Sequence, residues 1–343
     1  MEGHRAALEA WLAARAGAAS ARVSGLAKLS GGAIQENWAL DVAFEGGSRP
    51  GGLALVLRTD APSGVAESLG RAEEFALFSA AHAAGVTVPE PLWLDAEGAV
   101  TGRPLFVMAR VRGVAAGHLL VRAMAEGGAQ GPAAGAALAR TLGVELARIH
   151  TITPPRAELG FLGAVPENPG LAAVAEFRRW LDGHRVPHPI LEWGLRWLER
   201  NAPPPGPPVL CHNDFRTGNY MVEGARLTAV LDWEFAAWGD AQADLGWFCA
   251  PCWRFGALAA EAGGIAPREA FYAGYEAAGG RVDRPRARYW EVMATLRWAV
   301  IALQQAERHV SGGERSLELA LTAHVLPALE LDIMEMTAEE SHA

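Results

Sequence analysis

Three side chains that carry oxygen ligands, Asp214, Asn219 and Asp232, lie close together in the sequence. Asn219 follows Asp214 by five residues, and Asp232 comes thirteen residues after Asn219. Carboxylate and amide oxygens suit a hard cation such as Mg²⁺, which keeps coordination positions open for phosphate oxygens. A carboxylate that stays off the metal can accept a proton from an alcohol. The three side chains therefore predict metal-assisted phosphate chemistry on a hydroxyl group.

The flanking pattern predicts how these side chains are positioned. A polar loop at 212–219 is followed by two apolar runs, 220–222 and 227–231, with a Glu-Gly turn between them. This pattern is typical of a loop followed by a strand, a turn and a second strand that ends on Asp232. A solvated acidic loop would explain one aspartate. It would not explain three such groups at strand boundaries.

The same residues resemble the catalytic core of the kinase superfamily, where a catalytic Asp, an Asn five residues on and a metal-binding Asp occur in this order. The sequence LDWE at 231–234, the HxD form at 212–214, and the pairs at 239–240 and 244–245 are similar to the aminoglycoside phosphotransferase family. That family usually has Gly where this chain has Asn213. We expect little effect there, because this side chain need not touch substrate.

The resemblance implies a role for each residue of the motif. Asp214 would orient and deprotonate the acceptor hydroxyl, and Asn219 and Asp232 would hold Mg²⁺ on the phosphates of ATP. Arg216 stands where protein kinases often have a Lys. It either neutralises charge on the transferred phosphoryl group or is a surface arginine.

The N-terminal third reads as a small sheet. A helix at 4–18 is followed by strands at 23–29 and 38–44, with Ser30, Gly31 and Gly32 between the strands. Backbone N–H groups can approach phosphate closely where Gly removes the side chain. We expect this turn to cover the ATP phosphates, although a Gly-Gly turn is more often only part of a hairpin.

The next strand, at 53–57, ends at Arg58, on the face that it shares with Val56. In kinases this strand supplies a Lys to the α- and β-phosphates, and the residue two positions earlier packs on adenine. Arg is always charged and binds phosphate through two donors, so Arg58 can keep the role of the Lys. A solvent-exposed strand end is the alternative. Lys28, just before the Gly turn, is the other candidate for the phosphate cation, but it lacks an evident partner, and we expect it to be solvated.

A helix at 66–84 places Glu74 on its apolar face. A carboxylate there needs a partner, and we predict that the partner is Arg58. The run at 105–109 reads as the last strand of the sheet, with a hinge after it. The resemblance implies that the backbone near Ala109 and Val111 meets adenine beside Met108, a residue that would equally fit plain core.

The fold class that follows is α+β, a two-lobed protein-kinase-like fold. Residues 1–109 would form a nucleotide-binding lobe, an antiparallel sheet with one helix. Residues 110–343 would form a mostly helical catalytic and acceptor-binding lobe. Helices are predicted at the following positions: 133–150, 267–278, 285–309 and 314–332.

Composition narrows the function further. The 343 residues carry a net charge of −9, which argues against a nucleic-acid partner held through its phosphates. No apolar run is long enough to span a membrane, and the N-terminus does not resemble a signal peptide. The pair Cys249 and Cys252 lacks the second ligand pair of a zinc site. We expect a cytoplasmic protein, and a homodimer remains open.

The expected activity is phosphoryl transfer from ATP to a small-molecule hydroxyl. The Ser-Gly-Gly turn, the strand at 56–58 and the LDWE motif most resemble the subgroup related to kinase-like domains fused to acyl-CoA dehydrogenases. This implies a hydroxyacyl thioester or a similar alcohol. The alternatives are an aminoglycoside acceptor, for which a dense acidic floor is not evident, and a nucleotide-binding pseudokinase. The intact Asp214, Asn219 and Asp232 argue against a pseudokinase.

Overall fold

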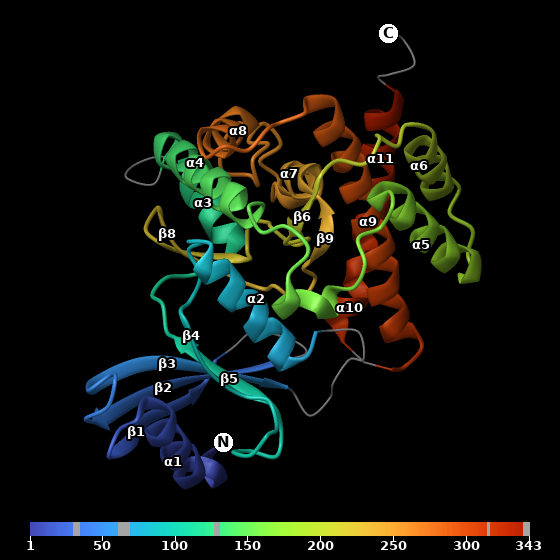
Figure 1. The fold of residues 1–343 in the computed structure, drawn as a ribbon. Helices are drawn as coiled ribbons and strands as arrows, with labels where there is room; N and C mark the ends of the chain where they lie inside the picture. Colours follow the sequence, from blue (N-terminus) through green and yellow to red (C-terminus); the bar gives the residue numbers. More distant parts are fainter. Residues whose placement is uncertain (30–34, 61–68, 127–130, 314–315, 339–343) are drawn as a thin grey trace.

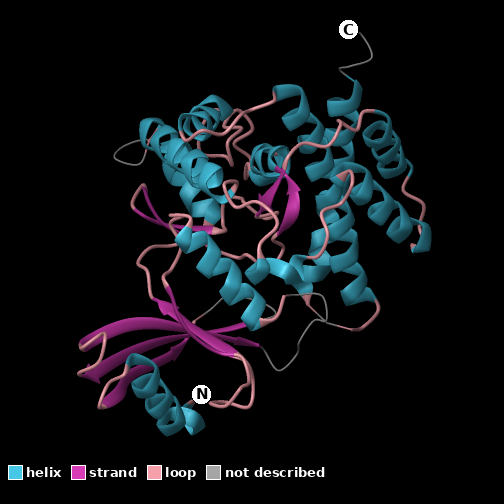
Figure 2. Cartoon of the chain, viewed as in Figure 1, coloured by secondary structure: helices cyan, strands magenta, loops and turns pink. Residues whose placement is uncertain are grey.

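The computed structural model describes residues 1–29, 35–60, 69–126, 131–313 and 316–338 (Figure 1). The predicted phosphate-covering turn, Ser30, Gly31 and Gly32, lies outside these residues. Strands gather into one large sheet at the N-terminal end, and helices make up most of the rest (Figure 2). Within the described ranges, no helix combines the length and the apolar character needed to cross a membrane.

The N-terminal part is a five-stranded antiparallel sheet with strand order β1-β2-β3-β5-β4. It confirms the predicted sheet and adds β4. The short 3-10 helix η1 (Glu2–His4) leads into α1. The elements are α1 (Arg5–Ala16), β1 (Ser20–Lys28), β2 (Gln35–Glu45), β3 (Gly51–Asp60), α2 (Arg71–Ala83), β4 (Pro91–Asp95) and β5 (Leu105–Ala109).

Side-chain alternation along β3 explains why helices cover both faces of this sheet. Leu55 and Leu57 pack with Leu8 and Leu12 of α1, whereas Val56 packs with the apolar side of α2. The two helices therefore lie on opposite faces (Figure 1). The face that carries Val56 also carries the next even-numbered residue, Arg58, and turns it toward α2 and the helical part.

The C-terminal part is mostly helical, with two short strand pairs, β6 with β9 and β7 with β8. Its strands are β6 (Pro208–Cys211), β7 (Tyr220–Glu223), β8 (Arg226–Val230) and β9 (Ala237–Asp240). Its helices are α3 (Gly117–Glu126), α4 (Pro132–Ile149), α5 (Pro169–Gly183), α6 (Pro189–Arg200), α7 (Ala241–Cys249), α8 (Arg268–Ala277), α9 (Arg284–Val310), α10 (Leu317–Thr322) and α11 (Leu326–Ala338). The short 3-10 helices are η3 (Ala157–Leu162), η4 (Pro251–Trp253) and η5 (Ala323–Val325).

One predicted helix is corrected by the structure. The segment expected as a single helix at 314–332 is α10, η5 and α11, and it continues to residue 338. Ser316 caps the start of α10 by accepting a hydrogen bond from Leu319 N–H. Pro327 follows η5, and because Pro has no N–H it interrupts the helical hydrogen-bond ladder there. The sequence pattern also left α5 and α6 unlocated.

The link between the two parts runs against β7. Val114 exchanges two backbone hydrogen bonds with Val222, at 2.9 and 3.0 Å. Just before it, Gly113 has φ 130°, and a Cβ at this position would lie 2.6 Å from the carbonyl oxygen of Val222. Only Gly fits this backbone approach, so the link is held close to the strand that follows the predicted catalytic loop.

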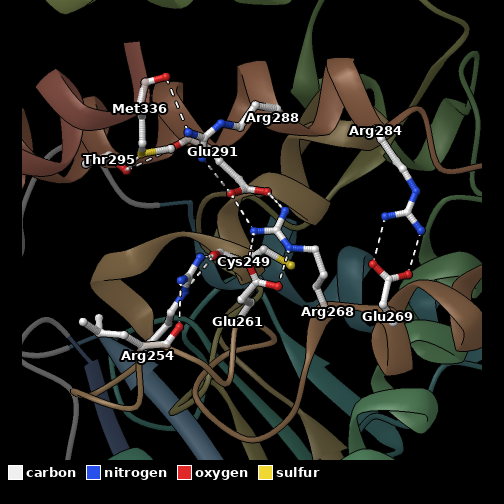
Figure 3. Close-up of polar contacts among 11 residues, drawn as sticks. Cys249, Arg254, Glu261, Arg268, Glu269, Arg284, Arg288, Glu291, Thr295 and Met336 are labelled. Atoms are coloured by element: carbon white, nitrogen blue, oxygen red, sulfur yellow. Dashed lines mark hydrogen bonds and ion pairs between the residues drawn. The ribbon is translucent and has the colours of Figure 1, made fainter. Parts of the chain in front are cut away.

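A partly buried ion-pair network fastens the segment after α7 to α9 (Figure 3). Arg268 donates to Glu261 at 2.7 Å and binds Glu291, whose side chain is fully buried. Such a buried arrangement is stable only because each charge has a partner. In the same segment, the Gly263 carbonyl accepts a 2.7 Å hydrogen bond from the Thr217 hydroxyl. The network therefore stabilises the segment that contacts the loop at 212–219.

Candidate active site

Asp214 sits on the loop that follows β6, and its side chain is only 13% exposed. Its Oδ1 accepts hydrogen bonds from Arg216 Nε at 3.0 Å and from Trp247 Nε1 at 3.1 Å. Its Oδ2 accepts one from the Asn219 amide. Because three donors from different positions converge on it, the orientation of this carboxylate is fixed.

The loop itself is held by Asp244 in the first turn of α7. Its carboxylate accepts the backbone N–H groups of His212 and Asn213, each at 2.7 Å, and lies 3.1 Å from His150 Nε2. Burial opposes ionisation of Asp244, but the hydrogen bond and charge of His150, together with His212, outweigh it and lower its pKa. His212 Nε2 also lies 2.8 Å from the Leu231 carbonyl oxygen, which ties the loop to β8.

Asn213 has a left-handed backbone, with φ 61°. Gly, which is usual here in the family that the sequence resembles, adopts this backbone without strain. Asn also tolerates the left-handed region, so it can stand at this position. Its side-chain amide donates to the Phe235 carbonyl at 3.0 Å. The side chain therefore fixes local structure.

The two predicted metal ligands flank the β7–β8 pair, with Asn219 directly before β7 and Asp232 just after β8. Leu231 N–H donates to the Asn219 carbonyl at 2.8 Å, and Asp232 follows directly, with φ 58° and a side chain that is 41% exposed. Because the amide nitrogen of Asn219 is engaged by Asp214, its amide oxygen is left for a cation. This pairing of an amide oxygen with an accessible carboxylate fits Mg²⁺.

Glu234 is a further carboxylate of this region to which the sequence analysis gave no role. Burial, and then the nearby charge of Asp232, raise its pKa to about 6. It belongs to the LDWE motif, so its position next to Asp232 was visible in the sequence.

The predicted pair between Arg58 and Glu74 is confirmed. Arg58 Nε donates to Glu74 Oε2 at 3.0 Å, and Arg58 Nη2 lies 2.8 Å from Oε1. The same Nη2 is 3.6 Å from Asp232 Oδ1. The alternative of a solvent-exposed strand end is therefore excluded, since the side chain of Arg58 is only 8% exposed.

Arg71 is a second partner of Glu74 that the sequence analysis missed. It binds Glu74 from three positions earlier on α2 and also lies 2.9 Å from Asp60 Oδ1. The i, i+3 spacing was the available signal. Burial raises the pKa of Glu74, and the charges of Arg58 and Arg71 oppose that rise.

Lys28 is solvated, as predicted, but it does have a partner. Its Nζ lies 2.7 Å from Glu36 Oε1, and its side chain is 53% exposed. The expectation that it has no partner was wrong because Glu36 stands on the neighbouring strand, β2. The register of β1 against β2 brings the two side chains together.

The residues expected near adenine lie where β3 meets β5. Val56 pairs with Met108 across the two strands, and both belong to the core that also includes the apolar side of α2. The N–H of Ala109 already donates to the Glu90 carbonyl at 2.9 Å. The N–H of Val111 makes no hydrogen bond within the described part of the chain.

A cavity of about 300 Å³ lies between α5, β9, α7 and α9, and two neighbours of Asp214, Asn213 and Trp247, line it. We call it the acceptor-side cavity. Its lining residues are Pro166, Pro169, Ala172, Ala173, Glu176, Phe177, Asn213, Ala237, Trp238, Gly239, Asp240, Ala243, Trp247, Trp290, Met293, Ala294 and Arg297. The sequence analysis assigned no site role to Trp247 or Arg297, because neither belongs to a motif that the chain displays.

The family model described as the phosphotransferase enzyme family matches residues 25–290. The chain belongs to this family. It is accordingly a phosphotransferase of the small-molecule kinase type, as the loop at 212–219 and Asp232 had predicted.

Two curated relatives show where else such a phosphotransferase region occurs. Acyl-CoA dehydrogenase family member 10 of Mus musculus is 29% identical over 57% of this chain, and member 11 of Gallus gallus is 31% identical over the same share. The matched regions are 18% and 25% of those proteins. The chain therefore matches a minor portion of each relative's length. The predicted resemblance to phosphotransferase domains fused to acyl-CoA dehydrogenases is confirmed, at 29% and 31% identity.

Solved structures share the fold. A Ralstonia eutropha protein, named as a candidate aminoglycoside phosphotransferase, matches with a TM-score of 0.74 at 20% identity, covering 97% of this chain and 98% of its own. Spectinomycin phosphotransferase, in a structure with ADP and spectinomycin, matches with a TM-score of 0.58 at 14% identity, covering 96% and 98%. The expected kinase-like fold is confirmed.

Proposed function

We propose that this phosphotransferase moves the γ-phosphoryl group of ATP to a hydroxyl group of a small molecule, with Asp214 as the general base. The observation that carries the proposal is the arrangement at Asp214. One carboxylate is oriented by Arg216, Asn219 and Trp247. Trp247, which donates to this carboxylate, also lines the acceptor-side cavity, and Asn219, a proposed metal ligand, donates to its other oxygen.

In the proposed reaction the acceptor hydroxyl donates a hydrogen bond to the Asp214 carboxylate. The hydroxyl oxygen attacks the γ-phosphorus, the bond from that phosphorus to the β,γ-bridging oxygen breaks, and ADP leaves. The proton of the hydroxyl passes to Asp214. Transfer of this kind needs little covalent help from the protein, so positioning and charge neutralisation supply most of the rate.

The charges on the phosphate side fit this reaction. Asn219 and Asp232 would hold Mg²⁺, which when bound supplies positive charge to the phosphate oxygens. Arg58, held by Glu74, would contact the α- and β-phosphates through its planar donor set. Arg216 lies against Asp214 and 4.6 Å above the Trp253 ring. We assign it to the developing charge of the transferred group.

The nucleotide base is proposed to lie against Val56 and Met108, with the backbone of Ala109 and Val111 along its edge. Ser30, Gly31 and Gly32 would cover the phosphates. The ADP held by the spectinomycin phosphotransferase of the same fold supports a nucleotide in this family. We place the boundary between the nucleotide-binding lobe, 1–109, and the catalytic and acceptor-binding lobe, 110–343, at the end of β5.

For the acceptor we propose a hydroxyacyl compound, either a thioester or the corresponding hydroxy acid, or a similar alcohol. The support is the likeness to acyl-CoA dehydrogenase family members 10 and 11 and the apolar lining of the acceptor-side cavity. Aminoglycosides are polycations and fit this cavity poorly. Of its two carboxylates, Asp240 is already bound to Arg286 at 2.5 Å, which leaves Glu176.

A screen of ATP consumption across hydroxyacyl-CoA compounds, hydroxy acids, simple alcohols and aminoglycosides tests the proposal. We expect ADP release that depends on an alcohol from the first groups, with one phosphate ester formed for each ADP. The Asp214→Ala variant serves as the reference for uncatalysed loss of ATP. Absence of a phosphorylated product with every acceptor class would overturn the proposed activity.

A further inference from the structure

Arg297 of α9 is an unusual residue for the wall of a cavity. Its Nη1 donates to the Asn213 carbonyl at 2.9 Å, and its guanidinium carbon lies 4.6 Å from the centre of the Trp247 ring. Its side chain is partly buried, and in the described part of the chain it makes no ion pair. Burial lowers the pKa of Arg297, and the charges of Asp214, Asp244 and Glu176 oppose that shift.

The remaining partners of Arg297 are not anions in contact with it. Trp247 and Phe235, whose ring centre is 6.0 Å away, supply only cation–π attraction. Of the carboxylates whose charge acts on Arg297, Asp214 and Asp244 are bound by donors of the loop at 212–219, and Glu176 is exposed on α5. The guanidinium also lines the acceptor-side cavity, so donors that the Asn213 carbonyl does not use are available to a ligand there.

Trp247 connects this cation to the proposed base. The Nε1–H of its indole donates to Asp214 Oδ1 at 3.1 Å, while the Arg297 guanidinium lies against the same ring. One indole therefore separates the carboxylate that would receive a proton from a cation that makes no ion pair within the described residues. A molecule that reaches both carries a hydroxyl and an anionic group separated by a short carbon chain.

We propose that Arg297 is the specificity-determining residue of the acceptor site and that the preferred acceptor is a hydroxylated molecule with an apolar body and a carboxylate. The inference rests on the proposed function for the position of the reacting hydroxyl. Arg297 holds the carboxylate through its free donors, a charge-assisted contact. Trp290, Met293 and Phe177 enclose the carbon chain.

The same arrangement selects against other alcohols. A cationic acceptor would meet Arg297 at close range in a partly desolvated cavity, where like charges repel strongly. A neutral carboxamide has the same shape as the acid but cannot balance the charge. The comparison of an acid with its amide therefore isolates the contribution of Arg297.

The test uses the full chain with Mg²⁺ and ATP. The acceptors are ω-hydroxy acids, from glycolate to ω-hydroxyhexanoate, and their matched carboxamides. We expect the wild type to show a Michaelis constant for the best acid at least ~10-fold below that of its amide. Arg297→Gln should raise the constant for the acid to the level of the amide, leaving the constants for the amide and for ATP unchanged.

Two further variants separate charge from structure. Arg297→Lys keeps a cation and a donor to the Asn213 carbonyl, so it should retain part of the preference for acids. Arg308→Gln removes the same charge from the far end of α9, where Arg308 contacts Gln305, and should behave as the wild type. Equal losses for acid and amide in Arg297→Gln would show that Arg297 only supports the loop, and would overturn the inference.

A binding measurement distinguishes this inference from the proposed function. Calorimetric titration with hexanoate and with hexanamide requires no turnover. We expect hexanoate to bind the wild type at least ~10-fold more tightly than hexanamide does, and this preference to vanish in Arg297→Gln. If that holds and no acid is phosphorylated, the anion site stands and the proposed reaction fails. If the wild type shows no preference for hexanoate, the inference is wrong.

Discussion

The two sides of Asp214 are built in opposite ways. On the side of Asn219 and Asp232 the charged groups already have counter-charges, as with Arg58 and Glu74 at 2.8 Å. The wall of the acceptor-side cavity is mostly apolar and aromatic. Its one cation, Arg297, has no ion-pair partner among the described residues. In the proposed reaction, the first side would bind ATP, the ligand common to every turnover. On the second side, the bound acceptor would supply the counter-charge for Arg297.

The contrast also separates what each side contributes to the reaction. The phosphate side requires charges fixed before the nucleotide arrives, because preorganised charge costs no rearrangement during transfer. In the proposed reaction, the acceptor side would determine which alcohol reaches Asp214. Substitutions on the two sides should therefore alter different kinetic constants.

The largest effect is expected at Asp214, where the two sides meet. Asp214→Ala should lower turnover by roughly 10²–10⁴-fold, the usual contribution of a general base, while nucleotide binding with Mg²⁺ stays nearly intact. Steady-state rates with an active acceptor and calorimetry with ATP check the two halves of this statement. Glu223→Ala, which removes an exposed carboxylate from β7, is the matched control. Unchanged turnover in Asp214→Ala would contradict the assignment.

The next effect tests the phosphate side alone. Arg58→Met should raise the Michaelis constant for ATP by about 10–100-fold, the range expected for loss of a charge-assisted contact. The constant for the acceptor should stay the same. Lys28→Met removes an exposed cation of the same sheet and should leave both constants unchanged. The reverse behaviour of the two variants would show that the strand assignment in the N-terminal part is wrong.

Arg58→Met should also make stability more dependent on pH. Arg71 remains on Glu74, so the loss of stability should be about 1–3 kcal/mol rather than the larger cost of an unpaired buried charge. Burial already raises the pKa of Glu74, and losing Arg58 raises it further. A raised carboxyl pKa means that the folded state holds its proton longer, so the deficit is present at neutral pH and shrinks as the pH falls toward protonation of Glu74. Denaturant titrations at several pH values measure it.

A smaller effect is expected at the metal site. Asp232→Asn removes one charge from the ligand set and should weaken Mg²⁺-dependent nucleotide binding roughly tenfold. Asn tolerates the left-handed backbone at this position, so the loop should keep its shape. Titration of Mg²⁺ at fixed ATP compares the two proteins. Superimposable curves would refute the metal role.

The smallest effect is expected at the residue that joins the two sides. Trp247→Phe keeps an aromatic surface for Arg297 but loses the N–H that donates to Asp214. Arg216 still holds the same oxygen, so turnover should fall only about 3–10-fold, in the range of one hydrogen bond. The Michaelis constant for ATP should not move. A rise in that constant would show that Trp247 serves the phosphate side instead.

The residues that we propose for the phosphate side could be named from the sequence because most of them lie in one contiguous motif. Asp214, Asn219 and Asp232 have a fixed spacing along the chain, and strand periodicity placed Arg58 on the face that meets Glu74. The fold class followed from the same order of motifs. The backbone at Asn213, with φ 61°, explains how Asn can stand where Gly is usual. The spacing of the motif alone did not explain this difference.

The acceptor side could not be predicted for a physical reason. Glu176, Trp247 and Arg297 come from three helices and meet only after those helices pack. An arginine in α9 has no sequence signature that separates an anion site from a solvated helix face. The ion pairs that Arg71 and Glu36 form were also missed. Pairing within a helix turn or between neighbouring strands depends on side-chain direction as well as on spacing.

The central claim is phosphoryl transfer to an alcohol at Asp214, and the fate of the phosphorus tests it most directly. Wild type and Asp214→Ala would each be incubated with ATP, Mg²⁺ and the acceptor panel, and the products followed by phosphorus NMR. The account predicts that the wild type forms a new phosphomonoester in step with ADP and that Asp214→Ala forms it at least ~10²-fold more slowly. Release of inorganic phosphate alone, or equal ester formation by both proteins, would contradict it.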